Sequence, residues 1–287
     1  MIFLVILSAL FLSLFSISKK FFKKDCPLFF TAVCCFFAGI VFLFSSGFKF
    51  SFDSKIIPYA LLFAGAYSVC NLTMLIALKK GSLSITGLVS AYSLILPTFY
   101  GVFFLDEKPS MFFYIGFVFL VVAIFLIGYK KSAEKNKEEK TVKKQVAVWC
   151  IVLAISFITN GLCSIVQTAQ QKALNGQYKS EFMLIALGLS TLLMLIFAVA
   201  TERDKIKEGF KDSIVYGSVS GLSNGLLNLF VMLSVNHLSV SLVFPLMAGL
   251  NLLFNFVVAR FVFKEKYKIA QYVGFVISII SVVFMNI

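Results

Sequence analysis

Two asparagines with hydrogen-bonding amides lie on one face of an uncharged helical stretch. In "YGSVSGLSNGLLNLFVML" (residues 216–233), Asn224 and Asn228 share this face with three glycines, in a spacing of i, i+4, i+7, i+8 and i+11. Amides donate and accept hydrogen bonds but do not titrate near neutral pH, so they favour recognition of a polar solute over acid–base chemistry. The same pattern also fits a tight contact between membrane helices, in which small residues allow close approach and amides bond across the interface. The glycines are Gly217, Gly221 and Gly225.

Two further pairs repeat this spacing elsewhere in the chain. Tyr67 and Asn71 lie four residues apart in "AGAYSVCNLTM", and Asn251 and Asn255 lie four apart in "LVFPLMAGLNLLFN". Tyr67 and Asn71 occupy the positions that correspond to the amide face of residues 216–233. We therefore expect these side chains to line one substrate cavity.

Prolines interrupt two apolar stretches. Pro97 and Pro245 each remove a backbone donor and clash with the preceding turn, so we expect helix breaks that free carbonyls to line a site or act as gates. A simple membrane kink is the alternative. Polar residues around the first break include two candidate substrate ligands, Tyr92 and Thr98; the others are Ser93 and Tyr100.

A motif that occurs twice indicates a tandem repeat. "DEKPSMFFYIGF" (residues 106–117) returns as "KEKYKIAQYVGF" (residues 264–275). We interpret the repeated acids as structural, each placed near the positive N-terminus of the next helix. The paired positions are Glu107 with Glu265 and Gly116 with Gly274.

Residues for metal or acid–base catalysis are scarce. The chain has one histidine, His237, and six cysteines without C-x-x-C spacing, so we predict no metal site and no cofactor. No ionisable residue lies near the middle of an apolar stretch, so we expect the site to consist of neutral groups. We interpret the three glutamines Gln167, Gln170 and Gln171 as interfacial.

The elements that position these groups are membrane helices. The chain has 287 residues, 60% of them hydrophobic and 14% charged, too apolar for a soluble domain. Ten runs are long enough to span a bilayer, and the first lacks the basic region and cleavage site of a signal peptide. The runs are 1–18, 28–47, 56–78, 82–105, 110–129, 146–171, 182–200, 213–235, 238–262 and 268–286.

Nearly all the charges lie in the gaps between these runs. We therefore assign the net charge of +13 to contacts with water and lipid head groups, and exclude nucleic acid as a partner. Loops after odd-numbered spans, counted with Arg260 and Lys268 at the ends of the adjoining runs, carry 21 Lys and Arg against 5 in the others. The positive-inside rule then predicts a multi-pass protein of the cell membrane with both termini outside.

The charged segment 130–144 divides the chain into two halves, 1–129 and 145–287, each with five spans. Because five is odd, the second half enters the membrane from the opposite side. The sequence therefore predicts an all-α polytopic membrane protein with ten transmembrane helices arranged as two inverted five-helix repeats. This architecture recurs in secondary transporters.

The arrangement resembles the EamA-type repeat of the drug/metabolite transporter superfamily. The resemblance rests on "KKGSLS", on "AYSLILPTFYGVFFLDEK" with its mid-membrane proline, and on the second copy in residues 235–266. It covers nearly the whole chain and implies a ten-helix transporter without specifying the substrate.

Two features depart from this family. Ten-span members usually keep both termini in the cytoplasm, opposite to the charge count. Small proton-coupled relatives carry a glutamate in the first span, whereas "MIFLVILSALFLSLFSIS" has no acid, so that coupling does not carry over.

We therefore expect a secondary transporter of a small organic solute that works by alternating access. A cavity without fixed charge suits neutral, zwitterionic or aromatic cationic solutes and suits phosphorylated sugars poorly. The alternatives are an integral-membrane enzyme and a non-transporting scaffold. An enzyme would need clustered acid–base or metal groups, and a scaffold would favour charged soluble domains. A channel would need a filter motif. The sequence makes no prediction of oligomeric state.

Overall fold

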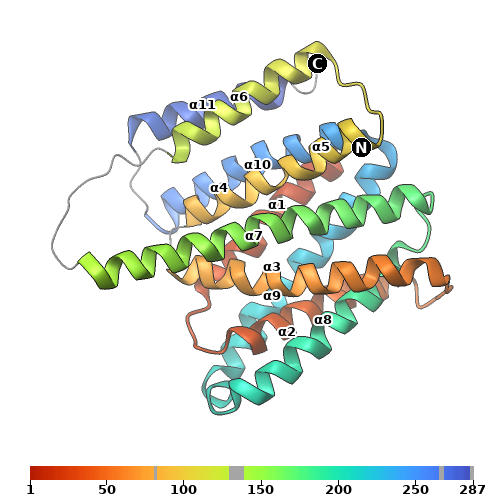
Figure 1. The fold of residues 1–287 in the computed structure, drawn as a ribbon, viewed down its shortest axis with the longest axis vertical. Helices are drawn as coiled ribbons and strands as arrows, with labels where there is room; N and C mark the ends of the chain where they lie inside the picture. The colour runs from red at the N-terminus through yellow and green to blue at the C-terminus, as the bar shows by residue number, and fades with distance from the viewer. Residues whose placement is uncertain (81–82, 129–138, 265–267, 285–287) are drawn as a thin grey trace.

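The computed structural model describes residues 1–80, 83–128, 139–264 and 268–284. These residues form α-helices and one 3-10 turn, Ser54–Ile56, and contain no strand (Figure 1). The helices are α1 (Ile2–Phe21), α2 (Pro27–Ser45), α3 (Ile57–Lys80), α4 (Leu83–Ser93), α5 (Ile95–Phe104), α6 (Met111–Gly128), α7 (Glu139–Ala173), α8 (Lys179–Thr201), α9 (Arg203–His237), α10 (Val240–Phe261) and α11 (Ile269–Phe284).

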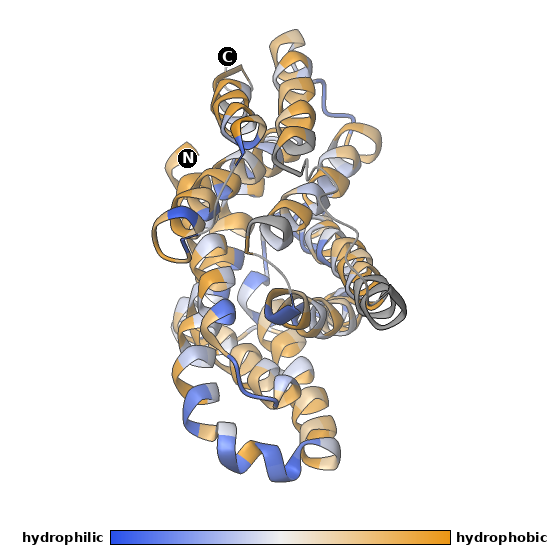
Figure 2. Cartoon of the chain, turned by 90° about the vertical axis from the view of Figure 1, so that its left-hand side faces the viewer, coloured by the Kyte–Doolittle hydropathy of each residue, from blue (hydrophilic) through white to orange (hydrophobic). Residues whose placement is uncertain are grey.

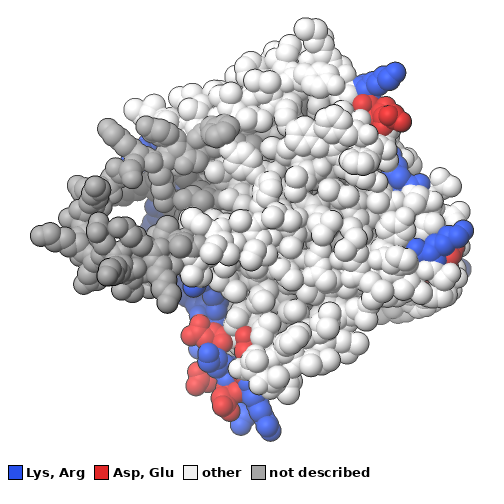
Figure 3. All heavy atoms as spheres, in the orientation of Figure 1, with Lys and Arg blue, Asp and Glu red and all other residues white. Residues whose placement is uncertain are grey.

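Most of the described helices are long and apolar enough to cross a membrane. By length and composition, eight helical segments of the described chain could span a bilayer, and α4 and α5 together form one of them. Two shorter apolar segments, Met111–Ala123 and Ile269–Ser281, lie in the remaining two predicted runs. Charged side chains gather at the helix ends with an uncharged band between them (Figure 3), and most of the ribbon is hydrophobic (Figure 2). The prediction of an all-α polytopic membrane protein is confirmed.

Two helices extend well beyond their predicted runs. Both α7 and α9 have 35 residues, because each continues at its N-terminal end into a charged segment. Hydropathy detects only the part of a helix that lies in lipid, whereas the backbone hydrogen bonds continue into water.

The helix contacts occur in pairs that correspond when the first five predicted spans are exchanged with the last five. Helix α1 packs against α9 and α10, and its counterpart α7 packs against α3 and the α4–α5 span. Helix α2 packs against α8 and α9, and α8 packs against α2 and α3. Helix α6 packs against α11, and α10 packs against α4 and α5. If each of the first five predicted spans is exchanged with the span at the same position among the last five, the list of packed pairs stays the same. Helix α1 begins and α11 ends at the same end of the bundle (Figure 1).

The two prolines have different effects on their helices. The fourth span is interrupted at Leu94, between α4 and α5, three residues before Pro97. Helix α10 is continuous through Pro245, so the predicted break there is wrong. The missing donor of a proline can be absorbed within a helix when neighbouring helices support the freed backbone groups.

The three glycines of α9 make a close contact with α2. A Cβ atom on Gly221 would lie 2.5 Å from the Cys34 carbonyl oxygen, and one on Gly225 would lie 2.9 Å from the Ala38 carbonyl oxygen. Gly217 faces Val33 of the same helix. The packing interpretation therefore holds for the glycines.

Candidate functional site

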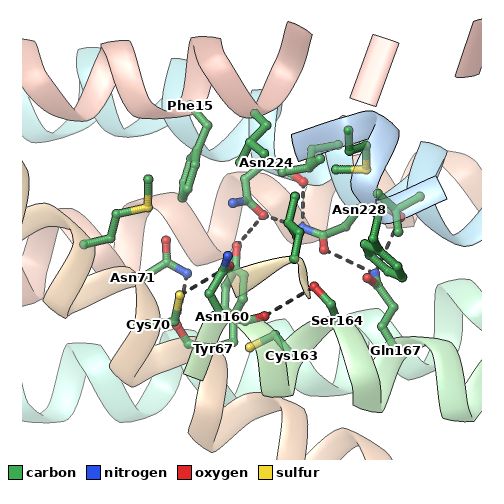
Figure 4. A pocket seen from close by; sticks show the side chains of 17 residues that line it. Phe15, Tyr67, Cys70, Asn71, Asn160, Cys163, Ser164, Gln167, Asn224 and Asn228 are labelled. Carbon is green, nitrogen blue, oxygen red and sulfur yellow. Dashed lines mark hydrogen bonds between the residues drawn. The ribbon is translucent and has the colours of Figure 1, made fainter. Parts of the chain in front are cut away.

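Polar side chains converge on one small cavity at the centre of the bundle (Figure 4). The cavity offers about 50 Å³ to the centres of water-sized molecules, enough for ordered water. Its walls come from α1, α3, α7, α9 and α10, together with Leu94 at the α4–α5 break. The four predicted ligands that line it are Tyr67, Asn71, Asn224 and Asn228.

A continuous set of hydrogen bonds links three of the helices around this cavity. The Tyr67 hydroxyl donates to Asn224 Oδ1 at 2.8 Å, and the Asn228 amide nitrogen donates to the same oxygen. Gln167 Nε2 of α7 donates to Asn228 Oδ1 at 3.2 Å. Asn224 Oδ1 therefore accepts two bonds, and its own amide nitrogen remains a donor on the cavity wall.

A buried lysine extends this network to α1. Lys19 Nζ donates to Asn71 Oδ1 at 2.8 Å and to the Asn71 carbonyl oxygen at 3.2 Å, and it lies 4.0 Å from the centre of the Phe15 ring. Lys19 is only 1% exposed, and both Asn71 and Phe15 line the cavity. A cation thus lies directly behind the cavity wall.

Lys19 corrects the expectation of a site without fixed charge. The predicted first span ended at residue 18, whereas α1 continues to Phe21 and its last turn packs against α3. Hydropathy placed Lys19 among the water-facing residues of the following loop. The side chain is buried because Asn71 supplies two acceptors inside the bundle.

Helix α7 contributes a polar stripe that the sequence analysis missed. Asn160, Cys163, Ser164 and Gln167 all line the cavity, and their spacing of i, i+3, i+4 and i+7 is that of one helix face. The interfacial assignment of Gln167 is therefore wrong. This spacing is visible in the sequence and could have revealed the stripe.

Asn251 and Asn255 do not line the cavity. Asn255 Nδ2 donates to Asn251 Oδ1 at 2.8 Å, and Ser13 donates to Asn255 Oδ1 at 3.0 Å. A Cβ atom on Gly87 of α4 would lie 2.8 Å from Asn255 Nδ2, so α4 approaches closely here. These asparagines form a separate buried cluster between α1, α4 and α10, and the structure does not bring them to the predicted site.

The predicted ligands near the helix break also lie outside the cavity wall. Thr98 donates to the Leu94 carbonyl oxygen at 2.9 Å, and Tyr92 packs on the apolar core. Ser93 instead accepts a hydrogen bond of 2.6 Å from the Asn160 amide. The break reaches the cavity through Leu94, which lines it, and is linked to it by the bond between Ser93 and Asn160.

Glu107 caps a helix of the other half of the chain. Its two carboxylate oxygens accept hydrogen bonds of 2.7 Å from the backbone N–H groups of Val240 and Ser241, at the start of α10. We expected the following helix, α6, so the partner was wrong although the interaction with a helix N-terminus was as anticipated. Its repeat counterpart, Glu265, lies outside the described residues.

The two repeated glycines lie in the peripheral α6–α11 pair. The Gly116 carbonyl oxygen accepts a hydrogen bond of 2.6 Å from Ser281, and Gly274 is buried in α11. Neither lines the cavity, which agrees with the structural interpretation.

Comparison with known families supports the resemblance seen in the sequence. Residues 1–129 match the model of the EamA-like transporter family, in agreement with the drug/metabolite transporter superfamily. That family is described as one of transporters. No curated protein matches the chain significantly.

Solved structures share the fold. One of them, described as "Crystal structure of protein", superposes with a TM-score of 0.68 over 99% of this chain and 98% of the other. The two sequences are 11% identical, so this likeness concerns the fold alone.

Proposed function

We propose that the protein is a secondary transporter that moves a small organic solute across the cell membrane by alternating access. The observation that carries this proposal is the central polar cavity, enclosed by α1 and α3 from the first five spans and by α7 and α9 from the last five. A site between two halves can be exposed to either side when the halves tilt against each other.

We further propose that residues 1–129 and 145–287 are inverted repeats joined by the linker 130–144. The exchange of helix pairs supports this division, because each main contact has a counterpart with the two halves interchanged. The family match over residues 1–129 ends where the proposed first repeat ends. The charge distribution supports a cytoplasmic linker with both termini outside.

The size of the cavity is consistent with a closed state. Sites for small organic ligands commonly have volumes of about 300–1,000 Å³. A space of about 50 Å³ holds water but no such solute, so helices must separate before loading. The interruption at Leu94 contributes to the cavity wall and provides a position where the fourth span can bend.

A binding screen followed by transport tests this function. Purified protein is heated with a panel of metabolites, because a ligand of the native state raises the melting temperature. Each hit is then offered to proteoliposomes preloaded with the same solute, and counterflow of labelled solute is measured against empty liposomes. We expect at least one hit to exchange. Hits that bind without exchanging, or a panel without hits, would contradict the proposal.

A further inference from the structure

Lys19 is a buried cation that contacts only neutral groups. The described chain contains one ion pair within 4.0 Å, between Lys79 and Asp25, and no described carboxylate lies that close to Lys19. Its neighbours are the two oxygens of Asn71 and the Phe15 ring. Dipoles and a ring face offset part of the desolvation cost of a charge, but they leave its positive potential unbalanced.

One donor on the cavity wall, the amide nitrogen of Asn224, has no hydrogen-bond partner among the described residues. Asn224 Oδ1 is occupied by Tyr67 and Asn228, so the amide is held with its nitrogen away from these bonds. Figure 4 shows this nitrogen pointing toward the side of the cavity where Phe15 and Asn71 lie. Asn71 and Phe15 also contact the Lys19 ammonium, so the cation and the free amide donor flank one part of the cavity.

The remainder of the wall is apolar or already hydrogen-bonded. Leu12, Met74, Leu227, Val231, Phe244 and Met247 supply uncharged surface, and the Asn228 and Gln167 amides bond to each other. A solute that satisfies this cavity presents an acceptor with negative charge at one end and an apolar body at the other.

We propose that the cavity recognises a small carboxylate-bearing solute, whose carboxylate accepts hydrogen bonds from Lys19 Nζ and Asn224 Nδ2. This inference rests on the proposed transport function and specifies the class of its substrate. The carboxylate replaces Asn71 Oδ1 as one partner of Lys19, and the Asn71 side chain gives up its hydrogen bond to the Tyr67 carbonyl oxygen as it turns into the cavity. A zwitterionic solute remains compatible with the site, whereas a simple cation is repelled by Lys19.

The test compares probes of similar size whose polar groups are negative, neutral or positive. Butyrate, butyramide and butylamine each contain four carbons, and inorganic phosphate serves as a second anion. Binding to the purified wild-type protein is measured by melting temperature and by calorimetry at one pH and ionic strength. We expect butyrate to bind about ten-fold or more tightly than butyramide, with no binding of butylamine. Equal binding of butyrate and butyramide, or tighter binding of phosphate than of butyrate, would overturn the assignment.

Lysine substitutions test whether Lys19 causes the preference for butyrate over butyramide. Lys19→Met should abolish the preference for butyrate over butyramide, and Lys19→Arg should retain it because the cation remains. Lys20→Met is the matched control: the adjacent lysine donates to the Leu78 carbonyl oxygen at 2.7 Å and does not line the cavity. Retention of the butyrate preference in folded Lys19→Met protein would contradict the proposal. If Lys19→Met does not fold, the wild-type comparison and Lys19→Arg still decide the question.

The result also separates this inference from the proposed function. If butyramide binds as well as butyrate and exchanges in proteoliposomes, the transport site remains and only the carboxylate assignment fails. If neither the probes nor the metabolite panel bind, both proposals fail.

Discussion

Tyr67 donates a 2.8 Å hydrogen bond to Asn224, and the two residues are 157 positions apart. The same displacement relates Asn71 to Asn228 in the repeated sequence. Tyr67 and Asn224 therefore occupy corresponding positions in the two proposed repeats, and both line the central cavity. Contact between corresponding residues is expected near a two-fold axis, so this bond links the halves at the point about which they are proposed to tilt.

Tyr67→Phe removes only the hydroxyl from this contact. Asn224 Oδ1 keeps its bond from Asn228, so we expect a modest loss of stability, about 0.5–1.5 kcal/mol, the net value of one hydrogen bond. The change should also alter the rate of exchange, because one bond between the halves is lost. Melting temperature and counterflow are the measurements, with Tyr100→Phe as a control outside the cavity wall. Identical behaviour of the two variants would argue against a role for the Tyr67–Asn224 contact.

Asn228→Leu and Gly221→Ala separate ligand binding from helix packing. Asn228 lines the cavity, so the leucine variant should weaken solute binding by about 1–3 kcal/mol, the cost of leaving a buried polar partner unpaired. Gly221 faces the Cys34 carbonyl oxygen, so alanine should force α2 and α9 apart and lower the melting temperature. Binding is measured on folded, monodisperse protein. Unchanged affinity in Asn228→Leu would remove this residue from the site.

Glu107→Ala should destabilise the start of α10. The change leaves the backbone N–H groups of Val240 and Ser241 without their acceptors, at a cost of about 1–3 kcal/mol. Asp106→Asn is the control, because asparagine tolerates the positive φ of 52° at this position. The melting temperatures of the two variants are compared. A fall of equal size in both would point to the loop, not to the cap.

The two prolines should differ in their importance for transport. Pro97→Ala restores a backbone donor beside the interruption at Leu94 and favours a continuous span, so we expect slower counterflow at normal expression. Pro245→Ala acts within a helix that is already continuous and should change the rate less. Initial rates in proteoliposomes provide the comparison. A larger effect of Pro245→Ala would place the moving element in α10.

The orientation of the chain can be tested at Ser132, in the linker outside the described residues. Five of the six cysteines are buried, so a Cys150→Ser background leaves little native thiol to react. We expect Ser132→Cys to resist a membrane-impermeant thiol reagent in intact cells and to react after lysis. Labelling of intact cells would reverse the proposed topology and agree with the orientation usual in the family.

The sequence by itself determined the all-α membrane class and the correspondence of Asn71 with Asn228 in the repeated stretches. Each of these depends on patterns along the chain: the length of apolar runs and the spacing of repeated motifs. Only the tertiary structure decided which polar residues meet. Asn251 and Asn255 have the same i, i+4 spacing as Asn224 and Asn228, yet they lie in a separate cluster, where Asn255 bonds to Ser13 and to Asn251.

The charge of the site was likewise decided by packing. Hydropathy counts Lys19 as the first residue beyond an apolar run, because a window along the chain registers its charge and not its neighbours. In the fold, α1 continues one turn further and α3 presents the two oxygens of Asn71 to the ammonium. The partners of Glu107 were also set by packing, since they lie 133 and 134 residues away along the chain, on α10. Burial of a charged group depends on the hydrogen-bonding partners that other helices bring to it, and these are set by three-dimensional packing.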